Sequence, residues 1–387
     1  MRIYEILLLG DHGRVETELV ATLRRMTAEY GLDPDELAIR QASDAANRSR
    51  RAATVGVFVG GAAQADATLL TELLSEGVPV LPTIDADQRF ETDVPGELRA
   101  INGLTRRGDD PKHAALATAV LECLGLLHRQ RRAFVSYRRT EAEPAAVQIF
   151  NELSARGFTV FLDTHSIRPG LVFQEELWHQ MCDCDVVLML DTATYFNGRW
   201  TREEIAKARG KELQVLRVIW PGIKPAKMGE LSETVYLSAA DLQAPHGPID
   251  PARLDAIATS VEWLRSRSVA SRHRSMSDRL RADLERIGGT FHGVGAHRAM
   301  SLELLSGKRV WAYPVVGVPT AETVYDIHTK ARLQGSSASP VLVYDDIGLR
   351  DGWLAHLDWL GEQIPAVRWV RINKAWWTLA EMGEMED

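Results

Sequence analysis

The stretch RAFVSY at residues 132–137 begins the part of the chain that fixes its fold class. It is short and mostly apolar, as a buried strand is, and the apolar spacing after it predicts a helix over 143–157 that ends at Gly157. A second strand is predicted at 158–163. Strands and helices that alternate in this order predict a parallel sheet with helices on both faces.

The same alternation continues toward residue 222. It predicts a helix over 171–184, a buried strand over 185–191, a helix over 199–208 and a strand over 214–222. Together these elements form a doubly wound α/β domain of about 140 residues, which is a common domain size.

Similar patterns flank this domain. Strands are predicted at 4–10, 54–61, 78–84, 308–318, 340–346 and 367–372, and helices at 16–32, 66–77, 113–130, 320–335 and 352–364. We therefore expect a first α/β domain over 1–130, the doubly wound domain over 131–250, a connecting helix pair over 251–288 and a tryptophan-rich α/β domain over 289–387. GVGAH (293–297) is expected to be a loop that no strand precedes.

The composition argues against several classes of protein. A formal charge of −8 and a pI near 5.8 disfavour non-specific binding to nucleic acid or to acidic membranes. No apolar run approaches the roughly 20 residues that span a bilayer, and acidic residues come too early in the sequence for a signal peptide. We expect a cytoplasmic protein that contacts neither membranes nor nucleic acid directly.

The three cysteines do not suggest a disulfide framework, because their number is odd and the chain is long. Cys182 and Cys184 lack the neighbouring His and Cys residues of a zinc site, so we expect reduced core thiols and no metal site. Two basic runs, 129–132 and 265–274, are expected to be a solvated linker and a solvated helix surface.

Several catalytic and nucleotide-binding motifs are missing. The sequence contains no G-x-x-x-x-G-K-[ST] loop, no G-x-G-x-x-G after a predicted strand and no G-x-S-x-G elbow. These absences disfavour a P-loop ATPase, a Rossmann dinucleotide fold and an α/β-hydrolase. No resident cofactor is expected.

The predicted helix over 199–208 carries two adjacent glutamates. Glu203 precedes Lys207 by four residues, so a surface ion pair worth a few tenths of a kcal/mol is its simplest explanation. Glu204 follows Trp200 by four residues, and a carboxylate beside an indole is partly desolvated, which strengthens its electrostatic field. On the residues alone, an exposed helix position is still the more ordinary explanation for Glu204.

Three motifs in order give the central domain a resemblance to a known family. AFVSYRR (133–139) is similar to the first strand of TIR (Toll/interleukin-1 receptor) domains, and the stretch over 157–170 resembles their second strand and BB loop. DVVLMLDTATYFNGRWTREEI (185–205) resembles the later strand and the W-x-x-x-E motif. The resemblance covers about residues 132–221 and implies a flavodoxin-like TIR fold.

Many bacterial TIR domains, and some from plants and animals, cleave NAD+ with the glutamate of W-x-x-x-E as the catalytic residue. The resemblance therefore implies that Glu204 is catalytic and that NAD+ is the substrate, with nicotinamide and ADP-ribose or a cyclic isomer as products. It also implies that Tyr137, Arg138 and Phe173 border the nucleotide. Trp200 would shape the pocket. Core packing is the alternative explanation for the three aromatic residues.

TIR enzymes of this kind gain activity when the domains stack, because the BB loop of one completes the site of the next. His165 and Arg168 fall in this loop, so the resemblance implies that they make assembly contacts in a homo-oligomer; a solvated turn is the alternative. The first domain resembles a degenerate TIR-like fold without W-x-x-x-E. We expect the two flanking domains to control assembly in response to an unknown ligand or protein, in bacterial antiphage or stress defence.

The central domain departs from the family pattern at three positions, and two other functions are compatible with its sequence. Asp191, Gly198 and Arg199 replace small hydroxyl residues of the family, which would alter substrate approach. A TIR domain can also be a non-catalytic scaffold that signals through homotypic contacts. A nucleoside 2-deoxyribosyltransferase-like enzyme would use the same fold and one carboxylate, although DTHSIRPG (163–170) fits it less well.

Overall fold

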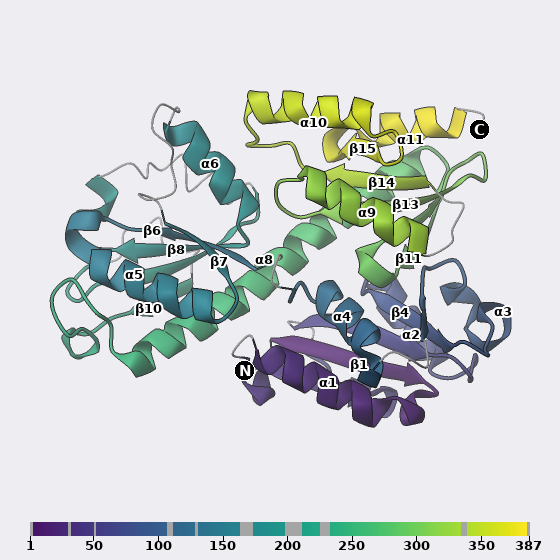
Figure 1. Ribbon diagram of the computed structural model, residues 1–387, viewed down its shortest axis with the longest axis horizontal. Helices are drawn as coiled ribbons and strands as arrows, with labels where there is room; N and C mark the ends of the chain where they lie inside the picture. Colours follow the sequence, from purple (N-terminus) through teal and green to yellow (C-terminus); the bar gives the residue numbers. More distant parts are fainter. Residues whose placement is uncertain are drawn as a thin grey trace. The chain divides into compact units, whose positions relative to one another are not determined.

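The computed structural model describes residues 3–29, 32–49, 52–106, 111–127, 131–162, 173–197, 211–224, 233–333 and 339–384. Within these ranges the chain forms three five-stranded sheets that alternate with helices (Figure 1). The α/β fold class expected from the alternating pattern, with a flavodoxin-like central sheet and α/β domains on either side of it in the sequence, is confirmed.

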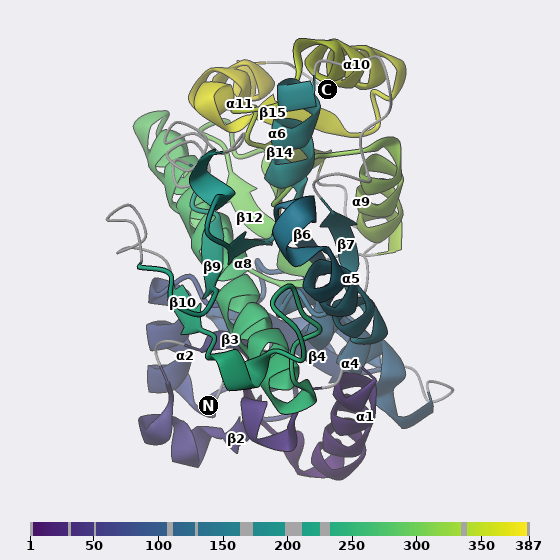
Figure 2. The ribbon, with the colours of Figure 1, turned by 90° about the vertical axis from the view of Figure 1, so that its left-hand side faces the viewer.

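The first sheet is entirely parallel and has the strand order β2-β1-β3-β4-β5. Its strands are β1 (Tyr4–Gly10), β2 (Leu37–Gln41), β3 (Ala53–Val59), β4 (Val80–Asp85) and β5 (Leu104–Arg106). Its helices are α1 (Glu16–Ala28), α2 (Ala67–Ser75), α3 (Phe90–Asp93) and α4 (Ala114–Cys123). Helices α1 and α2 lie on opposite sides of the sheet (Figure 2), so each face buries its apolar side chains.

The second sheet repeats this arrangement with the order β7-β6-β8-β9-β10. Its strands are β6 (Arg132–Ser136), β7 (Thr159–Leu162), β8 (Val186–Asp191), β9 (Gln214–Ile219) and β10 (Glu233–Tyr236). Apolar residues of α5 (Arg139–Ala155) and α8 (Pro251–Arg286) share one core cluster with one face. Helix α6 (Phe173–Asp183) contributes to the cluster on the other face.

The third sheet is mixed, with the order β11-β12-β13-β14-β15. β11 (Thr290–Val294), β12 (Met300–Glu303) and β13 (Arg309–Val315) are antiparallel, whereas β14 (Ser339–Tyr344) and β15 (Arg368–Arg371) continue from β13 in parallel. The helices are α9 (Ala321–Leu333), α10 (Asp351–Gln363) and α11 (Ala375–Glu384). The later part of α8 and α11 cover one face.

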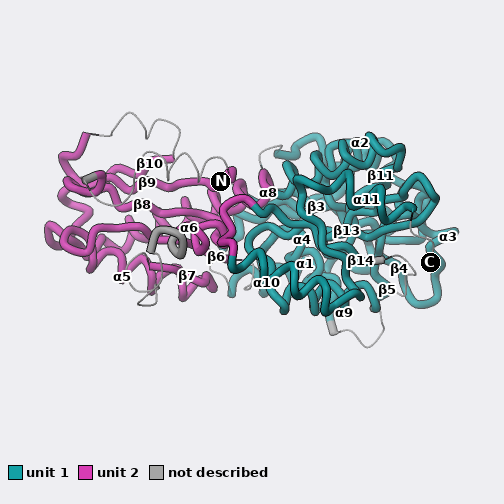
Figure 3. Tube along the Cα trace, turned by 90° about the horizontal axis from the view of Figure 1, so that it is seen from above, with its two compact units in different colours: residues 1–127, 273–346, 352–387 teal, residues 128–272, 347–351 magenta. Residues whose placement is uncertain are grey.

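Contacts between residues group the chain into two compact units (Figure 3). Unit 1 comprises 1–127, 273–346 and 352–387, and unit 2 comprises 128–272 and 347–351. Unit 1 therefore contains the first and third sheets, while unit 2 contains the second. Sequence patterns do not indicate this grouping, because it joins segments that are far apart in the chain.

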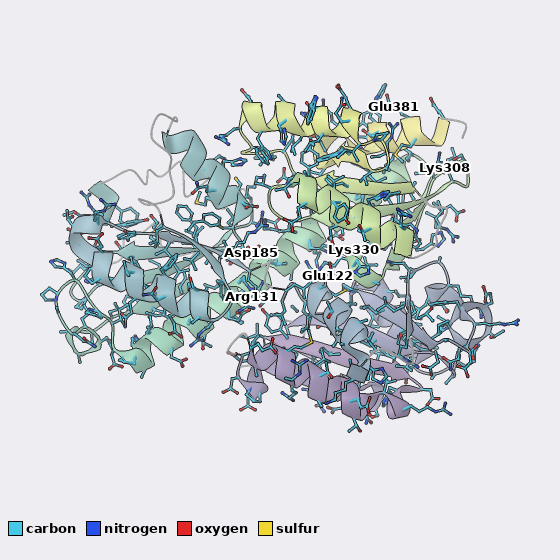
Figure 4. All side chains as sticks on the ribbon, in the orientation of Figure 1. Glu122, Arg131, Asp185, Lys308, Lys330 and Glu381 are labelled. Atoms are coloured by element: carbon cyan, nitrogen blue, oxygen red, sulfur yellow. The ribbon has the colours of Figure 1, made fainter. Side chains whose placement is uncertain are left out.

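Within unit 1, Glu122 at the end of α4 joins the first sheet to the third. It accepts hydrogen bonds from His297 Nδ1 at 2.6 Å and from the Lys330 ammonium, and Lys330 also reaches Asp326 Oδ2 at 2.5 Å. Figure 4 shows Glu122 and Lys330 side by side. Burial disfavours a charge on Glu122, but His297 and Lys330 outweigh this effect and lower its pKa to about 2.

The loop that carries His297 is held against α4 by further polar contacts. Arg298 donates from Nε and Nη2 to the carbonyl oxygen of Cys123, at 2.8 and 2.6 Å, and so satisfies the last turn of α4. Asn102 Nδ2 donates to the Ala296 carbonyl at 2.8 Å. His297 and Arg298 both have positive φ angles, 59° and 56°, which cost energy that these contacts must offset.

At the start of β6 and β8, buried charges tie unit 2 together. Glu262 of α8 accepts hydrogen bonds from Arg131 and from Arg265, and Asp185 lies 4.0 Å from Arg265 (Figure 4 labels Arg131 and Asp185). Arg131 and Arg265 are fully buried. The expectation that both basic runs are solvated is wrong for these two arginines and for Arg272, which is also buried. The signal that was missed for Arg265 is Glu262, three residues before it on the same helix.

Other expectations need correction. The strand β11 runs into GVGAH (293–297) and includes its first two residues, and the expected helix pair is one continuous helix, α8. The sequence patterns also missed the short strands β2, β5, β10 and β12 and the helices α3 and α11. The cysteines are free and buried, as expected. No helix in the described ranges combines the length and apolar character that a membrane span requires.

Candidate active site

The carboxyl edge of the second sheet is where its chemistry is concentrated. In this strand order the connections leave β6 and β8 toward opposite sides, so the ends of these two strands are the switch point of the sheet. Ligands of open α/β sheets bind at such switch points. The residues that follow β6 and β8 are therefore the first candidates for a site.

Tyr137 follows directly after β6 and only 3% of its surface is exposed, since it belongs to the core cluster with α5 and α8. Its neighbour Ser136 is also buried and accepts a hydrogen bond from the Tyr195 hydroxyl, with 2.8 Å between the oxygens. Tyr195 thus links the loop after β8 to the end of β6. Tyr137 and Tyr195 belong to different core clusters, so their rings pack on the two faces of the sheet.

Arg138 precedes α5 and reaches across the switch point. Its Nη1 donates to the carbonyl oxygen of Thr194 at 2.7 Å. One turn further into α5, Glu141 accepts hydrogen bonds from Thr194 Oγ1 at 2.8 Å and from Thr194 N at 3.2 Å. These three contacts fix Thr194 to the start of α5, so the loop after β8 leaves the sheet in a defined direction.

Glu141 is held in its ionised form. Its partial burial opposes ionisation, but the Thr192 and Thr194 hydroxyls, the Thr194 N–H and the Arg138 charge outweigh this effect and lower its pKa. His246 approaches from another segment, with Nδ1 2.9 Å from the Glu141 carbonyl oxygen. The start of α5 is therefore surrounded by charged and polar groups from three parts of unit 2.

Asp191, at the end of β8, is paired with Arg217 of β9. Both side chains are about 2% exposed, and Arg217 Nε donates to Asp191 Oδ2 at 2.8 Å. Burial raises the pKa of the Asp191 carboxyl, and the Arg217 charge opposes the rise. The guanidinium carbon also lies 5.3 Å from the centroid of the Phe196 ring. Asp191, which replaces a small hydroxyl residue of the family, is thus paired with an opposite charge inside the sheet.

The other expected site residues lie mostly outside the described part of the chain. Phe173 is the first residue of α6, and its side chain is not among those described. Trp200, Glu204, His165 and Arg168 lie outside the described residues. The structure therefore joins Arg138 to the loop after β8 and places Tyr137 in the adjacent core, and it leaves the roles of the other five residues as predictions.

Sequence patterns missed Glu141, Thr194 and the partner of Asp191. A signal for the pair was present, since VLRVI puts one arginine into an otherwise apolar strand while Asp191 ends another such strand. Nothing in the local sequence marked Glu141, because its partner is 53 residues away. Among the described residues, no group of three or more His, Cys, Asp and Glu side chains is placed to bind a metal ion.

Comparison with known proteins identifies the domain that contains this edge. Residues 133–247 match the family model of the TIR domain. No curated protein matches the chain. Among solved structures, the crystal structure of the leucine-binding protein LivK from Thermotoga maritima aligns with 12% identity over 80% of this chain and 97% of that chain. Its TM-score is 0.17, a level that does not indicate a common fold.

Proposed function

Because the chain contains a TIR domain over 133–247, we propose that it is an NAD+ nucleosidase that cleaves the bond between nicotinamide and ribose. The observation that carries the proposal is the spacing of Trp200 and Glu204, four residues apart in the W-x-x-x-E position of a matched TIR domain. Both residues follow, in sequence, the loop that Arg138 and Glu141 hold at the switch point.

One carboxylate is enough for this reaction. Glycoside hydrolases use two, because their leaving alkoxide needs a proton. The nicotinamide of NAD+ is cationic before cleavage and leaves as a neutral molecule, so no general acid is required. Glu204 would stabilise the oxocarbenium-like ribose and accept hydrogen bonds from its hydroxyls, and Trp200 would exclude water and strengthen that charge.

The acceptor decides the product. As the ribose–nicotinamide bond breaks, water forms the new bond at the ribose carbon and releases a proton, which gives ADP-ribose. An adenine nitrogen of the same molecule gives a cyclic isomer instead. In this scheme Arg138, which precedes α5, would attract the pyrophosphate through its positive charge. NAD+ is a substrate in this scheme, and no cofactor is required.

Assembly would control the activity. In the proposed scheme TIR domains of several copies stack, and the BB loop with His165 and Arg168 completes the site of a neighbouring copy. An activating ligand or protein would favour the stacked form, and NAD+ depletion or a cyclic product would then serve bacterial antiphage or stress defence. The protein would act in the cytoplasm, where NAD+ is available.

The test is a time course of NAD+ and nicotinamide, separated by chromatography, for the wild type and Glu204→Ala at low concentration and under crowding. Glu203→Ala is the matched control, because it removes a neighbouring carboxylate that we assign to a surface ion pair. We expect nicotinamide from the wild type and Glu203→Ala, and none from Glu204→Ala. Undiminished cleavage by an assembled Glu204→Ala preparation would refute the proposal.

A non-catalytic scaffold is the second candidate, and the burial of Tyr137 favours it. A residue expected to border the nucleotide has only 3% of its surface exposed. In a scaffold, the wild type and Glu204→Ala would form equal complexes and neither would release nicotinamide. The same preparations, analysed by light scattering, separate the two candidates.

A further inference from the structure

A five-residue segment between β14 and α10 belongs to the same unit as the TIR domain. Residues 347–351, which we call the strap, are part of unit 2, whereas the residues on either side of them, Asp346 and Gly352, are part of unit 1 (Figure 3). The chain thus leaves unit 1 and returns to it within five residues. The contacts of these five residues with unit 2 are therefore the feature to explain.

Gly348 makes that contact against α6. Its φ angle is +78°, and a Cβ atom added there would lie 2.8 Å from Cys182 Sγ and inside contact distance of Trp178 Nε1. The Cys182 thiol is 3.9 Å from the Gly348 carbonyl oxygen, a distance that fits a weak S–H hydrogen bond. Only glycine satisfies both the backbone conformation and the close approach.

The contacted side chains belong to one face of α6. Trp178 and Cys182 are four residues apart and therefore neighbours on the helix surface. The carboxyl end of α6 is also fixed to α8, because Arg272 donates to the carbonyl oxygens of Cys182 and Cys184 at 3.1 and 2.9 Å. The strap therefore packs against a helix whose carboxyl end is anchored to α8. Its other end, Phe173, directly follows in sequence the segment with the proposed assembly residues.

The strap emerges from the carboxyl edge of the third sheet, in unit 1. Asp346, the residue before it, accepts a hydrogen bond from Asn373 Nδ2 at 3.3 Å and lies 3.9 Å from Arg371 Nη1. Arg371 also binds both carboxylate oxygens of Asp358 on α10, at 2.6 and 2.7 Å. Carboxyl edges of parallel strands are the usual ligand sites of α/β sheets. Asp346 therefore connects this edge to the first residue of the strap through the chain itself.

We propose that the strap is an autoinhibitory contact: while Gly348 is seated on Trp178 and Cys182, α6 is held in a position that prevents TIR assembly. Release of the strap frees α6 and permits stacking. The proposal rests on the proposed function in one respect, since control of NAD+ cleavage requires that cleavage depends on assembly. Within the strap, Leu349 is buried and Ile347 is exposed.

The test uses the full-length chain with Gly348→Ala, which places a methyl group against Trp178, and with Trp178→Ala, which removes the contact from the other side. Gly352→Ala is the matched control, because its added Cβ would meet no atom within 4 Å. Hydrogen exchange of peptides covering 347–351 reports whether the strap is released. Peptides from β6 and β8 report whether the domain is still folded.

We expect both releasing variants to assemble at concentrations about tenfold lower than the wild type, as measured by light scattering, because the inactive state has lost its stabilising contact. NAD+ cleavage by dilute protein should rise by a similar factor, and Gly352→Ala should match the wild type. The inference is overturned if strap peptides exchange faster in a folded variant while its assembly stays at the wild-type level, or if the dilute wild type is already assembled.

The two proposals fail in different ways. If the releasing variants assemble more readily but no preparation releases nicotinamide, the proposed enzyme activity is wrong and the strap still controls assembly. If the assembled wild type cleaves NAD+ and the releasing variants show the same concentration dependence, the activity stands and the strap is not inhibitory.

Discussion

The first sheet and the TIR sheet have the same strand order and the same switch point, but their carboxyl edges differ. In the first sheet, the backbone N–H of Gly10 at the end of β1 donates to Asp66 Oδ2 at 2.9 Å, so this amide is bound by a carboxylate of the protein itself. In the TIR sheet, the corresponding edge carries Arg138 and Glu141, which hold Thr194 in the loop after β8.

Glycines close the first edge further. Gly10 and Gly61 have positive φ angles of 73° and 120°, and a Cβ on Gly10 would collide with the Val59 carbonyl oxygen. Gln88 fills the space beside the turn after β3, donating to the Gly60 carbonyl at 3.2 Å. One topology thus supports a closed edge in one sheet and a charged, cross-linked edge in the other, so the proposed function depends on side chains rather than on strand order.

The largest effect is expected from the buried pair of the TIR sheet. Arg217→Met should lower the free energy of unfolding of unit 2 by about 3–5 kcal/mol, because Asp191 would remain buried without its counter-charge. Urea denaturation followed through hydrogen exchange of β8 and β9 peptides measures this loss. The control is Arg106→Met in the first sheet, where the partner Asp85 is 38% exposed and about 1 kcal/mol or less is expected.

A double variant sharpens this prediction. Replacing both Asp191 and Arg217 by leucine removes the two charges together, so most of the lost stability should return. If the single and double variants are equally unstable, the loss comes from packing rather than from the unpaired charge.

Acid should destabilise unit 1 at a higher pH than unit 2. Burial and, to a lesser extent, Arg298 lower the pKa of His273 in unit 1 to about 3. The unfolded chain then binds a proton more readily than the folded one, so this stabilisation is present above pH 6.5 and is lost as the pH falls toward 3, with roughly 3 kcal/mol of it lost by pH 4.5. Burial raises the pKa values of Asp185 and Asp191 in unit 2, so these carboxyls lose no stability in acid.

Limited proteolysis at pH 7 and pH 4.5, with the fragments identified by mass, tests this difference. Unit 1 should become susceptible first. His273→Leu should remove most of the pH dependence of the stability of unit 1, because leucine has a similar volume and does not titrate. Earlier cleavage of unit 2 in the wild type would contradict the prediction.

A smaller effect is expected at the closed edge of the first sheet. Asp66→Ala removes the acceptor of the Gly10 N–H and should cost about 1 kcal/mol. Asp66→Asn keeps a side-chain oxygen and should cost less. The unfolding midpoint of unit 1 in urea measures both, and equal losses would mean that the carboxylate does not stabilise this turn.

The smallest effect is expected from Glu141→Gln, at a few tenths of a kcal/mol, because an amide still accepts from Thr194 and the site is partly solvated. The pKa of Glu141 is lowered in the folded state, so its contribution is present above the ordinary value of 4.5 and disappears as the pH falls below it. Wild type and variant should therefore converge in stability once the pH is low enough to protonate the folded carboxyl, well below 4.5, and a gap that persists there would point to a steric cause.

The sequence was sufficient for elements with a strong local pattern. The apolar runs predicted β1 and β8 to within a residue, and the helical spacing predicted α9 and α10. The short strands β2 and β5 were missed, because a strand of three to five partly exposed residues leaves little periodicity to detect.

The candidate site could be predicted only in part, because its residues contact partners that are distant in the chain. Arg138 was proposed through resemblance, but its contact with Thr194 depends on the register of β6 and β8, which no local pattern encodes. Similarly, His297 has no acidic residue nearby in sequence, and its partner Glu122 is 175 residues away. Buried ion pairs of this kind become visible only after the topology is known.

That separation has a consequence for synthesis on the ribosome. Glu122 precedes its partners His297 and Lys330 by 175 and 208 residues, so at about 5–20 residues per second it waits on the order of 10–40 s for them. The entire TIR domain emerges during this interval. A nascent chain, or one truncated near residue 272, would therefore present the proposed NAD+-cleaving domain before the strap that we propose restrains it has been synthesised.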